Sequence, residues 1–187
     1  MFVERVTGDH ISDLVATTKV VTVAGSTLRE LCSEAGFVPD PAFWVGDDTP
    51  PSRDPDEVIR LDGLATATLG EWFLLGVRSI DEVVASLPEP AATVGRLWPE
   101  HFDYGIDLEA APGTRCNLGA AAGDRFHAEP YLYVGPWGFA ESGLASTYWN
   151  APFGSFLPFA DIDAADDPIG TAIEFFTTGL AALRSAT

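Results

Sequence analysis

The sequence HFDYGIDLEAAPGTRCNLGAA, residues 101–121, decides the fold of this chain. Apolar and polar residues alternate over 101–108, a period of two that is typical of a β-strand with one face in a core. We expect one face to carry Phe102, Tyr104, Ile106 and Leu108, and the other His101, Asp103 and Asp107. A turn signal at 111–113 (Ala-Pro-Gly) precedes residues 115–121, which predict the returning antiparallel strand.

Other segments extend this pattern on both sides. Further strands are expected over residues 19–23, 129–137, 146–153 and 155–159. Thr27 and Glu30 form a capping-box sequence that starts a helix ending at Gly36. Three more helices are expected, from Asp54-Pro55 to about Gly76, from Ser79 to Leu87, and from Asp167-Pro168 onward.

The order of these segments predicts the fold class. Helices cluster early and strands late, and this segregation is typical of an α+β fold, an antiparallel sheet with helices packed on one face. We expect a single domain over residues 1–187: helix-rich over 1–90, strand-rich over 94–160, with a C-terminal helix over 167–184. Trp72 and Phe176 lie on apolar helix stripes and are expected to be buried.

Composition and charge exclude several classes of protein. The 187 residues are 47% hydrophobic, which excludes intrinsic disorder. The net charge of −18 argues against binding to nucleic acid or to anionic lipid. No run approaches the ~18 apolar residues of a membrane span. Cys32 and Cys116 follow no metal or redox spacing, so we expect two core cysteines in a cytoplasmic protein.

Histidine placement marks the candidate site. In an extended segment His127 and Glu129 point to one side of the sheet, and His101 joins them if its strand pairs nearby. These three residues are the candidate catalytic acid–base groups. The same three are the parts of a two-histidine, one-carboxylate site for a divalent metal, which is the alternative function. A purely structural role also stays open, in which His101 and His127 bond to the backbone or to Asp103 and Asp124.

Aromatic residues gather in the same half of the chain. They suit the walls of a ligand pocket as well as a core, because tyrosine and tryptophan carry a polar tip on an apolar body. The candidate ligand-binding residues are Trp98, Asp103, Tyr131, Tyr133, Trp149 and Asn150. We therefore expect a small-molecule binding or enzymatic domain, with no cofactor predicted beyond the metal of the alternative. A non-catalytic acidic module that binds a protein partner is the third interpretation.

An ordered set of motifs resembles a known family. The motifs are Leu97-Trp-Pro-Glu-His-Phe-Asp103, Asn117-Leu-Gly119, Gly123-Asp124, Glu129-Pro-Tyr-Leu-Tyr-Val134 and Gly154 to Phe159. Over roughly residues 96–183 they resemble the DUF5996-like group of uncharacterised bacterial proteins, including shorter actinobacterial members. The resemblance implies a shared fold and a bacterial origin, and it carries no activity. It also favours His101 with Glu129 over a two-histidine site, because the family often has an apolar residue where this chain has His127.

Overall fold

The chain divides into two compact units, Met1–Thr66 and Ala67–Thr187, and each is described by itself. The structure, a computed structural model, describes residues 2–7, 15–40, 42, 53–87, 92–98, 101–141, 144 and 147–186. Whether these two units together form the single domain predicted from the sequence stays a prediction.

The first unit begins with a hairpin that the sequence analysis did not anticipate. β1 (Phe2–Thr7) pairs antiparallel with β2 (Val15–Val20), so the strand expected over 19–23 ends at its second residue. α1 (Leu28–Ala35) confirms the capping box, with Thr27 and Glu30 bonding each other's backbone N–H. Gly36 ends the helix at φ 79°, a left-handed conformation that glycine adopts without steric cost.

The helix expected to start at Asp54 does not form there. The Asp54 carboxylate accepts from the backbone of Asp56, closing a local turn. The following backbone is paired elsewhere, because Arg29 N donates to Pro55 O (2.9 Å) and Ile59 N donates to Ser26 O (2.8 Å). In a helix Ile59 N would donate to Pro55 O, so these two bonds replace that helical bond.

One long helix replaces the two that were expected. α2 (Gly63–Ser86) begins where Asp62 Oδ1 accepts from Ala65 N at 2.8 Å. It runs through Gly76, which was expected to be a stop. A Cβ on Gly76 would lie 2.6 Å from Ala120 Cβ, so this glycine permits close packing of the helix on the sheet. Ser79, expected to begin a new helix, instead bonds Leu75 O inside this one.

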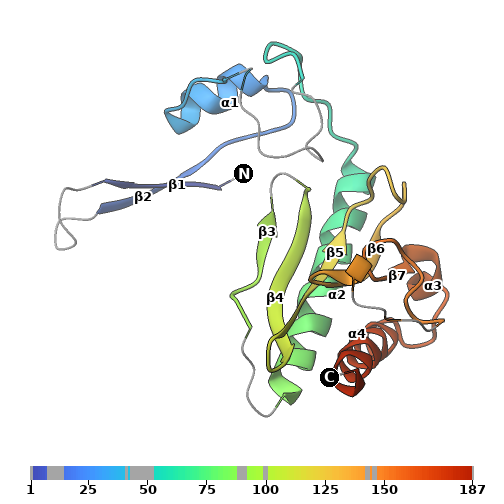
Figure 1. Ribbon diagram of the computed structural model, residues 1–187. Helices are drawn as coiled ribbons and strands as arrows, with labels where there is room; N and C mark the ends of the chain where they lie inside the picture. Colours follow the sequence, from blue (N-terminus) through green and yellow to red (C-terminus); the bar gives the residue numbers. More distant parts are fainter. Residues whose placement is uncertain are drawn as a thin grey trace. The chain divides into compact units, whose positions relative to one another are not determined.

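The second unit is built on a five-stranded antiparallel sheet, so the α+β class is confirmed (Figure 1). In spatial order the strands are β3 (Arg96–Trp98), β4 (Asp103–Ala111), β5 (Thr114–Ala121), β6 (Tyr131–Pro136) and β7 (Ser155–Pro158). A short 3-10 turn, η2 (Phe139–Glu141), and two helices, α3 (Phe159–Asp163) and α4 (Pro168–Ser185), complete it. None of the helices in the described ranges is long and apolar enough to cross a membrane.

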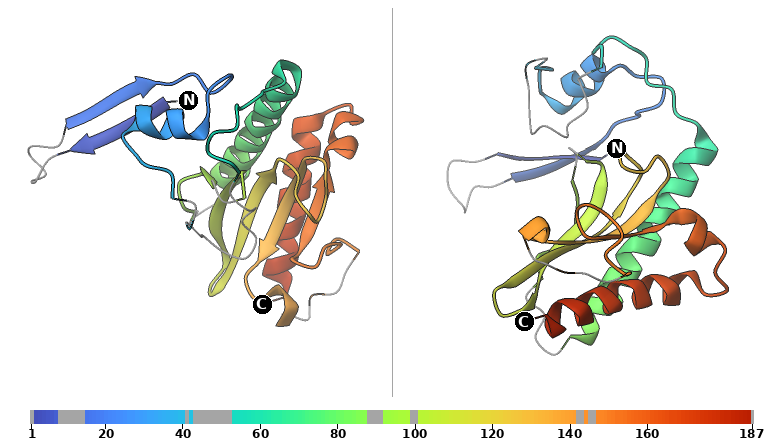
Figure 2. Two further views of the ribbon diagram at one scale, coloured as in Figure 1. Left: turned by 90° about the horizontal axis from the view of Figure 1, so that it is seen from above. Right: turned by 45° about the vertical axis from the view of Figure 1, so that its right-hand side comes forward.

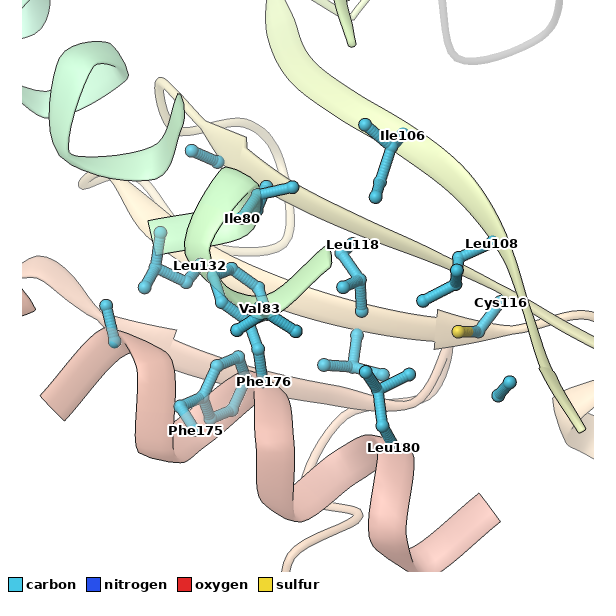
Figure 3. Packing of buried hydrophobic residues seen from close by; sticks show 14 of the residues in the cluster. Ile80, Val83, Ile106, Leu108, Cys116, Leu118, Leu132, Phe175, Phe176 and Leu180 are labelled. Atoms are coloured by element: carbon cyan, nitrogen blue, oxygen red, sulfur yellow. The ribbon is translucent and has the colours of Figure 1, made fainter. Parts of the chain in front are cut away.

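The core lies between one face of this sheet and helices α2 and α4. Figure 3 shows Ile80 and Val83 of α2, with Phe176 and Leu180 of α4, directed toward the sheet residues. The register of the strands places apolar residues side by side on this face, because Ile106 pairs with Leu118, and Leu118 pairs with Val134. Trp72 and Phe176 are 2% and 0% exposed, which confirms the expected burial. Figure 2 shows the two helices from further directions.

Alternate residues build the opposite side, called here the second face. Across β4, β5 and β6 one row joins Asp103, Ala121 and Tyr131. The next rows join Gly105, Gly119 and Tyr133, then Asp107, Asn117 and Gly135. The alternation of residues 103–108 therefore predicted the sides of this strand correctly.

The strand expected over 146–153 is wrong for the residues the structure describes. Residues 147–154 form an irregular loop with one isolated bridge, between Ala151 and Gly154. Side chains hold it, because Asn150 bonds both the N–H (2.9 Å) and the C=O (3.0 Å) of Phe156, and Ser155 Oγ donates to Tyr148 O. These bonds use edge groups of β7 that a further strand would need.

Candidate functional site

Two tyrosine–aspartate pairs lie on the second face. In the first, the Tyr133 hydroxyl donates to the carboxylate of Asp103, across two strands. The ring passes over Gly119 and Gly105, where a Cβ on Gly105 would already lie 3.0 Å from the hydroxyl oxygen. The absence of side chains at both positions is therefore what allows Tyr133 to reach Asp103.

The second pair organises the loop between β5 and β6. The Tyr131 hydroxyl donates to Asp124 Oδ2 at 2.7 Å, while Asp124 Oδ1 accepts from the backbone N–H of Phe126 and of His127. The Asp124 N–H donates in turn to His127 O at 2.8 Å. Asp124 thus fixes this turn in the way an aspartate commonly fixes a loop, by bonding the backbone two and three residues ahead.

His127 is held by this loop against aromatic rings. Its ring centroid lies 5.9 Å from that of Tyr131 and 5.3 Å from that of Phe156. Its Nε2 atom is buried and, among the described residues, has no hydrogen-bond partner. Phe126 and Phe153 pack edge to face at 5.0 Å beside the same rings. We call Asp103, Asp124, His127, Tyr131 and Tyr133 the His127 cluster.

The electrostatics of the cluster favour hydrogen-bond donation by the tyrosines. Burial raises the pKa of the Tyr133 hydroxyl well above its usual value, and the neighbouring Asp103 raises it further. Burial, and then the hydrogen bond to Asp124, raise the pKa of Tyr131 in the same way. Both phenols stay protonated at neutral pH and keep donating to the aspartates. They are built to orient groups, and neither can act as a base.

The three residues predicted to act in catalysis do not share a strand. β6 begins at Tyr131, so His127 and Glu129 lie in the preceding loop and not on the strand expected over 129–137. His127 and Glu129 are not held on one side as they would be on a strand, because the Asp124 turn replaces extended backbone there. His101 lies in the turn before β4, where Phe102 has φ 53°. In the described structure, no hydrogen bond, ion pair or ring contact joins His101 or Glu129 to His127; both are exposed.

The predicted ligand-binding residues divide into two groups. Asp103, Tyr131 and Tyr133 belong to the His127 cluster, as their shared side of the sheet predicted. Trp149 instead packs against the main core with Tyr148, and Asn150 fastens the loop to β7. Trp98 lies exposed on β3, with the Arg96 guanidinium 5.5 Å above its ring.

No group of three or more His, Cys, Asp or Glu side chains in the described ranges is arranged to hold a metal ion. The metal-dependent alternative stays a prediction. Of the two cysteines, Cys116 is fully buried, and its burial raises the pKa of the thiol to about 12.

Four residues in or beside the cluster, Asp124, Phe126, Phe153 and Phe156, were not among the predicted site residues. Asp124 was expected only as a partner of the histidines in the interpretation without function and as part of a family motif, although a Gly-Asp pair after a strand is itself a turn signal. Phe126, Phe153 and Phe156 come from a loop and an edge strand whose meeting depends on tertiary structure. No periodicity in the sequence brings these segments together.

Comparison with family models, with curated proteins and with solved structures finds no match for this chain. The case for a function therefore depends on the geometry of the His127 cluster.

Proposed function

We propose that this chain binds a small molecule on the second face of its five-stranded sheet, at the His127 cluster. The observation that carries the proposal is the buried Nε2 of His127, which has no hydrogen-bond partner among the described residues. A buried polar atom without a partner costs about 1–3 kcal/mol, and a ligand group that bonds it removes that cost.

The surroundings of His127 define the ligand chemistry that fits. Phe126, Phe153 and Phe156 supply apolar contact, while the Nε2 atom of His127 has room in its hydrogen-bonding capacity for one bond to a ligand. The ligand is therefore an aromatic or aliphatic body with a hydroxyl or amino group. Binding is favoured over catalysis here because both tyrosines are protonated donors engaged with aspartates. The relation to the DUF5996-like group is part of this proposal and carries no activity with it.

The test is a binding screen with phenol, benzyl alcohol, aniline and benzylamine, followed on the histidine side-chain nitrogens by NMR. We expect at least one probe to shift the His127 Nε2 resonance saturably. His127→Phe keeps the ring contacts but removes the nitrogens, and it is expected to weaken that probe at least tenfold. His101→Phe is the matched control, since His101 is exposed in a turn, and it should leave binding unchanged. Equal affinity in wild type and His127→Phe would contradict the proposal.

A further inference from the structure

Trp137 lies beyond the end of β6, and its indole is held rigidly although it is 58% exposed. Its Nε1–H donates to Asn117 Oδ1 at 3.1 Å, and its backbone N–H donates to Arg115 O at 2.9 Å. The Arg115 guanidinium lies 5.0 Å from the centroid of the indole. The backbone bond holds the chain at Trp137, and the two side-chain contacts orient an aromatic ring that remains open to solvent.

The residues beneath the indole are themselves fixed. Arg115 forms a two-point ion pair with Asp107, with Nε 3.2 Å from Oδ1 and Nη2 bonded to Oδ2. The hydrogen bond to Asp107 raises the pKa of the Arg115 guanidinium above its usual value, so Arg115 stays charged. Asp107 is anchored in turn, because its backbone exchanges bonds with Thr93.

The fixed conformations of these side chains do not contribute to packing of the hydrophobic core. Residues 107, 115 and 117 lie on the second face, away from the packed cluster that α2 and α4 cover. Exposed Arg and Trp side chains normally sample several rotamers, and ordering them on binding costs conformational entropy. Side chains that are already ordered make a site that loses less free energy when a ligand arrives.

The charge and hydrogen-bonding groups restrict the ligand class. Arg115 is neutralised by Asp107, and Glu109 stands opposite Arg115 on β4, which leaves the cluster about one unit negative. In a chain of net charge −18 this disfavours phosphates and other anions. Within the described structure the Asn117 Nδ2 amino group has no hydrogen-bond partner, so it can donate to a ligand. A neutral ligand with one apolar face and a hydroxyl-bearing edge is complementary.

We propose that Trp137, with Asn117 and Arg115, forms a second binding site that takes a neutral pyranose sugar. The C–H bonds on one side of a pyranose ring carry partial positive charge and stack on the negative face of the indole. The equatorial hydroxyls then reach the Asn117 amide at the edge of the indole, while the Arg115–Asp107 pair supports the opposite face of the ring. A site with one stacking ring is expected to bind weakly, with a dissociation constant on the order of 1 mM. This inference does not depend on the His127 cluster.

The experiment titrates the full chain with methyl glycosides of glucose, galactose, mannose and N-acetylglucosamine. Binding is followed on the five tryptophan indole N–H resonances and on the asparagine side-chain NH2 resonances, so Asn117 reports binding in the variant that lacks Trp137. Trp137 is expected to shift saturably with at least one glycoside. Trp137→Ala should weaken binding of that glycoside at least tenfold, and Asn117→Ala several-fold. Trp98→Ala is the matched control, because Trp98 is also exposed and also lies under an arginine but lacks the asparagine bond.

Trp137 and Asn117 are exposed, so both variants are expected to fold, and circular dichroism confirms this before titration. The proposal is overturned if no glycoside shifts Trp137 at concentrations well above the expected dissociation constant. It is equally overturned if choline or benzoate binds Trp137 and the sugars do not, or if Trp98→Ala removes the sugar response.

Discussion

At the scale of single residues, Tyr133 and Asp103 are the most constrained pair on the second face. Asp103 is 8% exposed, and the Tyr133 ring fits only because Gly119 and Gly105 have no side chains. Tyr133→Phe removes one donor to a buried carboxylate and is expected to cost about 1–3 kcal/mol of unfolding free energy. Chemical denaturation with matched m-values measures it.

Tyr131→Phe provides the comparison for this change. Asp124 is exposed and keeps its two backbone donors when the Tyr131 hydroxyl is removed. Its loss is expected to be smaller, about 0.5–1.5 kcal/mol. Equal losses of unfolding free energy in the two variants would show that the burial of Asp103 does not increase the cost of removing its tyrosine donor.

The same residues show how far sequence reasoning reaches into the site. Alternation of side chains placed Asp103 with Tyr131 and Tyr133, because the period of two holds wherever the backbone is extended. Alternation does not apply to His127 and Glu129, because Gly123 at φ 104° and the Asp124 turn break the extended backbone before β6. His127 still contacts Tyr131, as predicted, but the loop brings it there. The contacts of Phe153 and Phe156 arise from chain segments that only the fold brings together.

At the scale of elements, α2 gives a paired test of helix packing. Gly70 has open space around its Cβ position, whereas a Cβ on Gly76 would lie 2.6 Å from Ala120 Cβ. Gly70→Ala is expected to stabilise the protein by about 0.5–1 kcal/mol, because alanine loses less backbone entropy in a helix. Gly76→Ala is expected to destabilise it by about 1–3 kcal/mol through overpacking.

Thermal and chemical unfolding of the two variants measure these opposite signs. Stabilisation by both would mean that α2 can move away from β5 at little cost. The pair also explains the error in the predicted helices, since the sequence cannot distinguish a glycine that ends a helix from one that a sheet approaches. Helix starts were predicted correctly where a capping side chain bonds the first turn of its own helix. Thr27 does so in α1, and Asp167 bonds Gly170 N at the start of α4.

Anchoring of α2 to the sheet depends on one large side chain. Trp72 is 2% exposed, its Nε1–H donates to Ala121 O at 2.8 Å, and its ring meets Phe159 edge to face at 5.6 Å. Trp72→Ala is expected to cost about 3–5 kcal/mol, because it opens a cavity in the core and leaves a buried carbonyl without its donor. Trp98→Ala, at an exposed position, is the control and should change stability by less than about 0.5 kcal/mol. Denaturant midpoints of the two variants measure both changes in stability, and similar midpoints would contradict the role given to Trp72.

At the scale of the whole molecule, the tyrosines set the response to alkaline pH. Burial raises the pKa of Tyr131, Tyr133 and Tyr148 in the folded chain above the value of about 10 that they take when unfolded. Their contribution to stability is complete below pH 10 and is lost as the pH rises toward the folded values. Each should remove about 1.4 kcal/mol per pH unit above 10.

Tyrosinate absorbance recorded together with circular dichroism checks this behaviour. Phenolate formation should coincide with loss of structure. More than one phenolate per chain formed while the dichroism is unchanged would show that these hydroxyls ionise in the folded protein, since the fourth tyrosine, Tyr104, is only half-buried.

The response to salt depends on the charge of the entire chain. A net charge of −18 arises from 28 acidic and 10 basic residues, so most carboxylates cannot pair with a cation; Arg29–Asp56, Arg53–Glu57 and Arg115–Asp107 are ion pairs among the described residues. Repulsion among unpaired carboxylates destabilises the compact state. Raising sodium chloride from about 0.01 M to about 0.1 M shortens the screening length from ~30 Å to ~10 Å, so the melting temperature is expected to rise. A flat or falling melting temperature would show that local pairing outweighs repulsion across the molecule.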